Sequence, residues 1–113
     1  MNKLEEKIAF YIQKAKELNL DLSEDLITKV TKGLGPSIYK KDAEIVSCAD
    51  KSELDRVREN FLKKKLSLSN SDEELDAALK EICEKMGSSN KNKYRAIFYS
   101  LLVQKFNKED IYS

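Results

Sequence analysis

The chain has 113 residues, of which 21 are basic and 20 acidic, so its net charge is +1. Its 41% hydrophobic content suffices for the core of one domain, and three glycines with one proline leave few turn formers, which favours helices. Histidine is absent, and this excludes Ser-His-Asp catalysis and histidine-ligated zinc.

Helical spacing of apolar residues in the first part of the chain predicts a helix over residues 3–18. A second helix is expected from Ser23, an N-cap residue, to Gly33 and Gly35, which can adopt the positive φ that ends a helix. Pro36 fits the first turn of a following short helical segment.

Two capping boxes, Asp50-x-x-Glu53 and Ser71-x-x-Glu74, predict the starts of two further helices. Gly87 suits the C-terminal cap of the second. The last helix is expected to begin near Ser89 or Asn90 and to carry the strongest apolar stripe of the chain. The sequence therefore predicts one all-α domain over residues 1–113, a compact orthogonal bundle of five or six helices with no sheet.

Four stretches resemble a known family in their order and spacing. They are Lys29–Tyr39 (KVTKGLGPSIY), Asp42–Ser47 (DAEIVS), Asn60–Leu66 (NFLKKKL) and Ser89–Phe106 (SNKNKYRAIFYSLLVQKF). The family is a small bacterial one of uncharacterised proteins, the domain of unknown function 2853. The resemblance implies a small, soluble, bacterial, single-domain protein, and it implies no activity and no site residues.

Charges are segregated along the chain. Segments 32–41 and 87–106 contain bases and no acid, whereas five acids lie in 42–55 and six in 67–86. Blocks of this kind are typical of helices that complement one another when packed. Nucleic acid is disfavoured as a partner, because phosphate-driven binding normally needs a basic excess.

The first acid-free segment holds candidate anion ligands, namely Lys32, Gly33, Gly35 and Ser37. Glycines before a helix start can expose backbone N–H groups to an anion, and a lysine and a serine would assist. The spacing matches neither a Walker motif nor a dinucleotide fingerprint. The simpler interpretation is a helix cap followed by a proline-started helix.

The second acid-free segment adds Lys91, Lys93 and Arg95, which the predicted helix start places in its first turns. Bases there oppose the helix dipole, so the segment is a candidate for anion binding, with Tyr39 and Tyr99 as contributors. The simpler interpretation is that these bases pair with the acidic blocks. Arg58, a further contributor, lies inside an apolar helical arc, where a guanidinium needs a carboxylate or carbonyl partner.

Cys48 and Cys83 have no CxxC spacing, so the sequence predicts reduced, half-buried thiols. A disulfide, a redox role or a shared metal are the alternatives. No metal or cofactor site is predicted. Phe10, together with Leu20, Leu22, Ile111 and Tyr112, could form an exposed patch or pack into the bundle.

We expect a non-enzymatic binding or protein-interaction module whose partner is another protein or a second copy. The alternative is a domain for a small anion, such as phosphate, a nucleotide or nucleic acid, that uses segments 32–41 and 87–106. Carboxylate-based catalysis is disfavoured, because successive acids such as Asp72 and Glu73 point about 100° apart. No secretion signal and no membrane span are expected, which indicates the bacterial cytoplasm.

Overall fold

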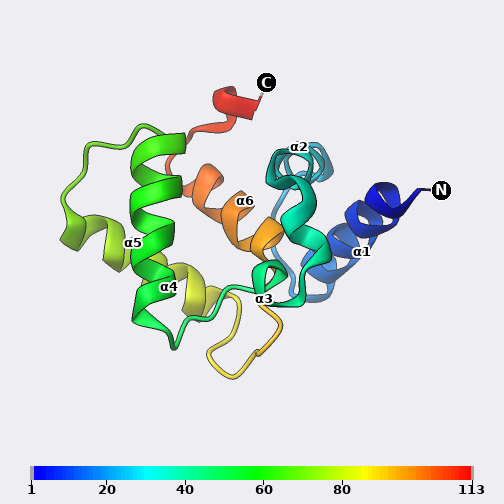
Figure 1. The fold of residues 1–113 in the computed structure, drawn as a ribbon, viewed down its shortest axis with the longest axis horizontal. Coiled ribbons are helices and arrows are strands. Elements are labelled where there is room, and N and C mark those ends of the chain that lie inside the picture. The colour runs from blue at the N-terminus through cyan, green and yellow to red at the C-terminus, as the bar shows by residue number, and fades with distance from the viewer. Residues whose placement is uncertain (1, 113) are drawn as a thin grey trace.

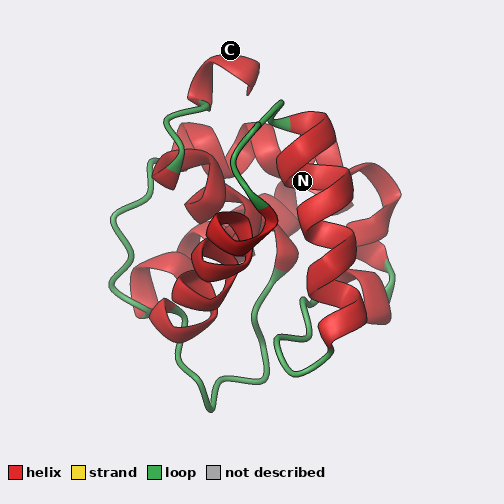
Figure 2. Ribbon diagram, turned by 90° about the vertical axis from the view of Figure 1, so that its left-hand side faces the viewer, coloured by secondary structure: helices red, strands yellow, loops and turns green. Residues whose placement is uncertain are grey.

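The computed structural model describes residues 2–112, and within them the predicted all-α bundle is confirmed. The α-helices are α1 (Lys3–Glu17), α2 (Glu24–Leu34), α3 (Lys41–Glu44), α4 (Lys51–Arg56), α5 (Asp72–Lys85) and α6 (Arg95–Lys105). Two 3₁₀ segments, η1 (Gly35–Tyr39) and η3 (Glu109–Tyr112), and a π-helix, η2 (Val57–Lys65), complete the described part. The connections between helices run over the outside of the bundle (Figure 2).

Helix α6 is the centre of the bundle. It lies between α1 and α2 on one side and the α4–η2 and α5 helices on the other (Figure 1). Every residue from Ala96 to Val103 is buried, so this helix is covered all round. The strong apolar stripe of the sequence therefore marks the central helix, as expected for a helix that is apolar on more than one face.

The predicted N-caps are confirmed. Ser23 accepts a hydrogen bond from the Leu26 amide (3.0 Å), and Ser71 accepts one from the Glu74 amide (3.2 Å). The carboxylate of Asp50 accepts the Ser52 amide at 2.9 Å. These side chains satisfy amides that have no partner within the helix, which fixes where each helix begins.

The helix that starts at Lys51 changes to π geometry at Val57. Its last turn shows the wider spacing, because the Leu66 amide donates to the Phe61 carbonyl at 2.9 Å. Val57, Phe61, Leu62 and Leu66 are buried together. A π-helix has more residues per turn than an α-helix. These four apolar side chains therefore stay on one face of the helix, whereas α-helical spacing would spread them around it.

Two expectations about helix ends were wrong. The last helix begins at Arg95 rather than near Ser89 or Asn90, so Lys91 and Lys93 lie in the loop before it. Gly33 lies inside α2 and only Gly35, with φ 65°, has the positive φ of a cap. A Cβ on Gly33 would lie 3.2 Å from a ring carbon of Tyr112, so this glycine accommodates the packed C-terminal segment.

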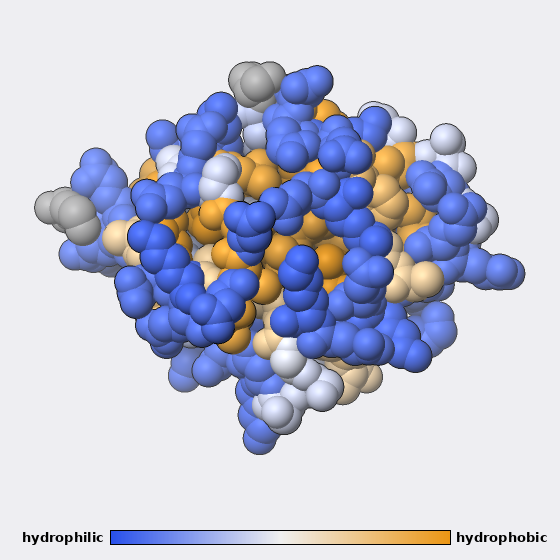
Figure 3. Space-filling view, turned by 180° about the vertical axis from the view of Figure 1, so that it is seen from behind, coloured by the Kyte–Doolittle hydropathy of each residue, from blue (hydrophilic) through white to orange (hydrophobic). Residues whose placement is uncertain are grey.

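The residues of the candidate apolar patch fall into two groups, one packed against the core and one exposed. Leu20, Leu22 and Tyr112 pack against the core, whereas Phe10 and Ile111 are 39% and 37% exposed. Among residues 2–112, Tyr39 is a further large exposed hydrophobic residue, at 47%. Apolar residues also show between polar ridges when the molecule is seen from behind (Figure 3). No helix in residues 2–112 is long and apolar enough to cross a bilayer.

Candidate anion-binding site

A hollow of about 480 Å³ opens between the loop that follows α3 and the loop that precedes α6. Its lining contains two lysines, three serines and an asparagine, and no carboxylate among the described residues. The lining residues are Ile45, Val46, Ser47, Cys48, Ala49, Ser88, Ser89, Asn90, Lys91 and Lys93. We call this site the basic hollow.

Its two walls are held together near their ends. The Val46 amide donates to the Lys93 carbonyl at 2.8 Å, and Ile45 and Tyr94 form an isolated antiparallel bridge. Within the second wall the Asn90 side chain donates to the Met86 carbonyl (3.0 Å) and so continues the end of α5 into the loop. The hollow is therefore built from backbone segments with fixed partners.

A disulfide between Cys48 and Cys83 ties the first wall to α5, with Cα atoms 6.1 Å apart. The prediction of two reduced thiols was therefore wrong. The two residues lie 35 apart in the sequence, and they meet because α4 and α5 pack beside each other. Cys48 is half-buried and lines the basic hollow, whereas Cys83 is buried at 8% exposure.

The two lysines of the hollow differ in their surroundings. Lys93 is only 5% exposed, and its ammonium group donates to the Asn90 carbonyl. Lys91 is exposed at the rim. An ammonium group carries three donors, so the carbonyl contact of Lys93 leaves donor capacity beside the hollow.

Arg95 faces away from the basic hollow and into an internal network. Its guanidinium donates to the Ala43 carbonyl (2.6 Å), to the Tyr99 hydroxyl (2.8 Å) and to the Glu53 carboxylate. Burial lowers the pKa of Arg95, but the hydroxyl and the carboxylate more than offset this and raise it above the ordinary value. Burial also raises the pKa of Tyr99, whose ring stacks on Phe61 with centroids 3.9 Å apart. This cation thus joins α6 to the acidic block 42–55.

The residues of the first acid-free segment lie elsewhere. Exposed Lys32 lines a separate hollow of about 450 Å³ between α1 and α2. Ser37 donates to the Leu34 carbonyl at 2.9 Å and Gly35 caps α2. Tyr39 lines a third hollow with Phe10. The structure therefore does not bring Lys32–Ser37 and Lys91–Lys93 into one site.

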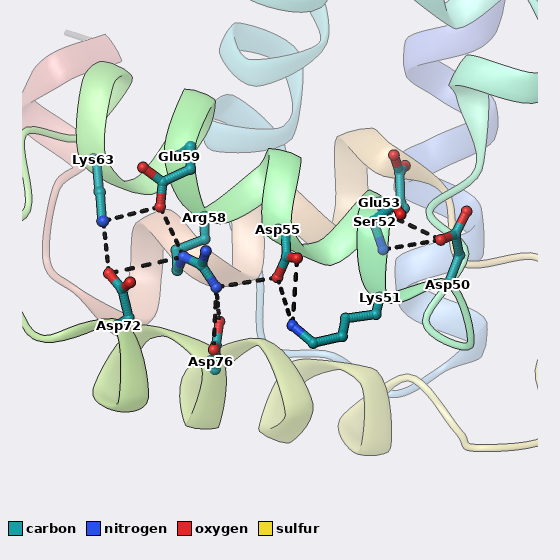
Figure 4. A network of polar contacts seen from close by, with 10 residues as sticks. All are labelled: Asp50, Lys51, Ser52, Glu53, Asp55, Arg58, Glu59, Lys63, Asp72 and Asp76. Atoms are coloured by element: carbon teal, nitrogen blue, oxygen red, sulfur yellow. Dashed lines mark hydrogen bonds and ion pairs between the residues drawn. The ribbon is translucent and has the colours of Figure 1, made fainter.

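Arg58 has carboxylate partners on two helices (Figure 4). It pairs with Asp55 (3.1 Å) and Glu59 (2.8 Å) on its own helix and with Asp76 (2.9 Å) on α5. The hydrogen bonds that Arg58 donates to Glu59 and Asp76 raise the pKa of Arg58. The partner that the buried arc requires is therefore a set of carboxylates.

Lys63 extends the network, with contacts of 2.9 Å to Glu59 and 2.6 Å to Asp72. Hydrogen bonds from Arg58 and Lys63 lower the pKa of Glu59, and one from Lys63 lowers the pKa of Asp72. These cations and carboxylates neutralise one another between η2 and α5, and they act as a clamp between the two helices.

A further polar cluster was not predicted from the sequence. The buried Tyr11 hydroxyl donates to a Glu44 carboxylate oxygen at 2.5 Å, and Lys7 contacts the same oxygen at 2.7 Å. Burial, followed by this hydrogen bond, raises the pKa of Tyr11 far above its ordinary value. The signal in the sequence was weak, since Tyr11 belongs to the apolar stripe of α1 and Glu44 to an acidic block.

The family of proteins of unknown function DUF2853 matches residues 10–110. The chain belongs to this family. No curated protein matches it. The match covers the walls of the basic hollow, both cysteines and the partners of Arg58 and Arg95, so all of these features lie within the DUF2853 domain.

Proposed function

We propose that this DUF2853 protein is a non-enzymatic binding module that holds an anionic group in the basic hollow. The observation that carries the proposal is a hollow lined by Lys91 and the buried Lys93 with no carboxylate in its lining. Other cations of the bundle, such as Arg58 and Arg95, already have carboxylate partners. A lysine buried next to serine side chains and backbone amides supplies the charge and the donors that an oxyanion requires.

The volume of the hollow indicates the size of the ligand. About 480 Å³ lies within the range of small-molecule sites and exceeds what one inorganic phosphate fills. We propose a phosphorylated or carboxylated small molecule as the ligand class, and the bacterial cytoplasm as the place where it is met. Nucleic acid stays disfavoured, because the chain has a net charge of only +1.

Amide NMR of the disulfide-bonded chain tests this proposal. Titration with inorganic phosphate at low salt is expected to shift amides of residues 46–49 and 88–93 saturably. Lys91→Gln should weaken the binding several-fold, whereas Lys64→Gln, which removes the same charge at the far end of η2, should not. Small linear shifts spread over the whole chain would contradict an anion site in the hollow.

A second candidate function is self-association through the exposed aromatics Phe10 and Tyr39. The two side chains line one hollow with Lys3, Glu6 and Lys7, a set that carries both signs of charge and can complement its own copy. Sedimentation of the full chain tests it. We expect a concentration-dependent dimer that Phe10→Ser abolishes and Ile111→Ser, at a similarly exposed site, does not. A monomer at every concentration would exclude self-association.

A further inference from the structure

The disulfide lies where a small molecule in the basic hollow would reach it. Cys48 is part of the lining, whereas Cys83 is buried, at 8% exposure, and is absent from the lining. The site of attack in thiol–disulfide exchange depends on which sulfur is accessible. An incoming thiolate therefore meets Cys48 first.

The charge around this sulfur selects the thiol. A thiolate is the attacking species, and it carries a negative charge that the lysines of the hollow attract. Lys91 and Lys93 share the lining with Cys48, and none of the acids in residues 2–112 does. A thiol that carries an additional acidic group is attracted more strongly, because both its thiolate and its acidic group interact with the same two lysines.

We infer that Cys48 is a site of thiol exchange for small anionic thiols that enter the basic hollow. The inference rests on the proposed function, since it uses the same cationic lining. It also accounts for a disulfide in a chain that we place in the cytoplasm, where such bonds are commonly transient or redox-sensing.

The chemistry proceeds in two displacements. The thiolate attacks the Cys48 sulfur, a mixed disulfide forms there, and the Cys48–Cys83 bond breaks with Cys83 leaving as a thiolate that takes a proton from water. A second thiolate then attacks the small-molecule sulfur of the mixed disulfide and releases Cys48. Two thiols are oxidised to one disulfide while the protein disulfide is reduced to two thiols.

Three thiols on one two-carbon scaffold test the charge selection, namely anionic mercaptoethanesulfonate, neutral mercaptoethanol and cationic cysteamine. The rate of protein reduction by each is divided by its rate with an uncharged small disulfide, which removes differences in nucleophilicity. At low ionic strength we expect the anionic thiol to be about tenfold faster than the neutral one, and the cationic thiol to be slowest. Added salt should reduce the differences.

Variants separate the hollow from the rest of the surface. Lys91→Gln should reduce the preference for the anionic thiol about threefold, and the matched control Lys64→Gln should leave it unchanged. Equal normalised rates for the three thiols would overturn the inference. It would also fail if the air-oxidised chain showed two free thiols after denaturation.

The position of attack has its own test. In Cys83→Ser the remaining Cys48 should react quickly with an anionic aromatic disulfide, whereas Cys83 in Cys48→Ser should react slowly in the folded protein. Circular dichroism of both variants verifies the fold, and a faster reaction at Cys83 would overturn the assignment. If phosphate fails to bind while the charge preference persists, only the anion-holding function is lost. If phosphate binds and the preference is absent, only the exchange site is lost.

Discussion

Arg95 and Glu53 form an ion pair in which each side chain is only 12% exposed. The same guanidinium binds the Ala43 carbonyl, so one side chain connects α3, α4 and α6. Arg95, which the sequence predicted as an anion ligand, thus has a structural role in joining these helices. Breaking such a pair leaves a charge with poor solvation, which costs more than the pair contributes.

Glu53→Gln is expected to lower the free energy of unfolding by about 2–3 kcal/mol. The matched control is Arg56→Gln, which removes the exposed partner of the same carboxylate and should cost less than about 1 kcal/mol. Urea unfolding of both variants measures the difference. Equal losses would show that Arg95 does not depend on this carboxylate.

Reduction of the disulfide is expected to destabilise the fold by about 3–4 kcal/mol, because a closed loop of this length restricts the unfolded chain. Urea unfolding with and without a phosphine reductant measures the loss. The double variant Cys48→Ser/Cys83→Ser should unfold near the reduced wild type and respond to no reductant. An unchanged midpoint on reduction would exclude the expected contribution.

The ionic clamp between η2 and α5 predicts that the folded protein loses stability as the pH falls into the acid range. The pKa values of Glu59 and Asp72 are lowered in the folded state, so the unfolded state binds more protons as the pH falls. This contribution is complete above the ordinary pKa values of 4.5 and 3.8 and is lost as the pH falls through the lowered ones. Urea midpoints from neutral pH downwards should show this loss.

Lys63→Gln should make that decline shallower, because it removes a hydrogen-bond partner of both carboxylates. Lys64→Gln, next to it on the same helix, should leave the slope unchanged. Parallel profiles for Lys63→Gln and wild type would mean that the clamp does not couple to protonation.

Tyr11→Phe is expected to cost about 1–2 kcal/mol, since a partly buried carboxylate loses a hydrogen bond but keeps its contact with Lys7. Tyr39→Phe, at an exposed ring, is the control and should be neutral within error. Alkaline titration by ultraviolet absorbance adds a second measure. Burial raises the pKa of Tyr112 to about 12 and also raises that of Tyr11, so both phenols should titrate above the ordinary tyrosine value of 10.0.

Local signals predicted most of the helices. Apolar spacing gave their number and faces, and Ser23, Asp50 and Ser71 gave three starts because a cap is a contact within one turn. The start of α6 was misplaced, because its N-cap residue Tyr94 makes no side-chain cap bond that a pattern could reveal. The π geometry of η2 was missed, since Val57, Phe61 and Leu62 also fit one broad face of an α-helix and only Leu66, directly after η2, departs from it.

The candidate site was predicted only in part. Lys91 and Lys93 attract notice because their segment contains no acid, and they line the basic hollow. The opposite wall, with Ser47 and Cys48, comes from a distant part of the chain and has no local signature. The disulfide was missed for the same reason, since a pairing between a loop and a distant helix follows from packing and not from spacing in the sequence.

The bond between Cys48 and Cys83 turns the middle of the chain into a covalent ring with two arms. The ring contains α4, η2 and α5 with their ionic clamp, and the second arm carries α6, the helix at the centre of the core. A protease that cuts the loop between η2 and α5 would therefore leave two fragments that the disulfide still joins in one covalent molecule. Only reduction of the disulfide would let the two fragments separate, so the same bond that shapes the hollow also decides whether a cleaved chain stays in one molecule.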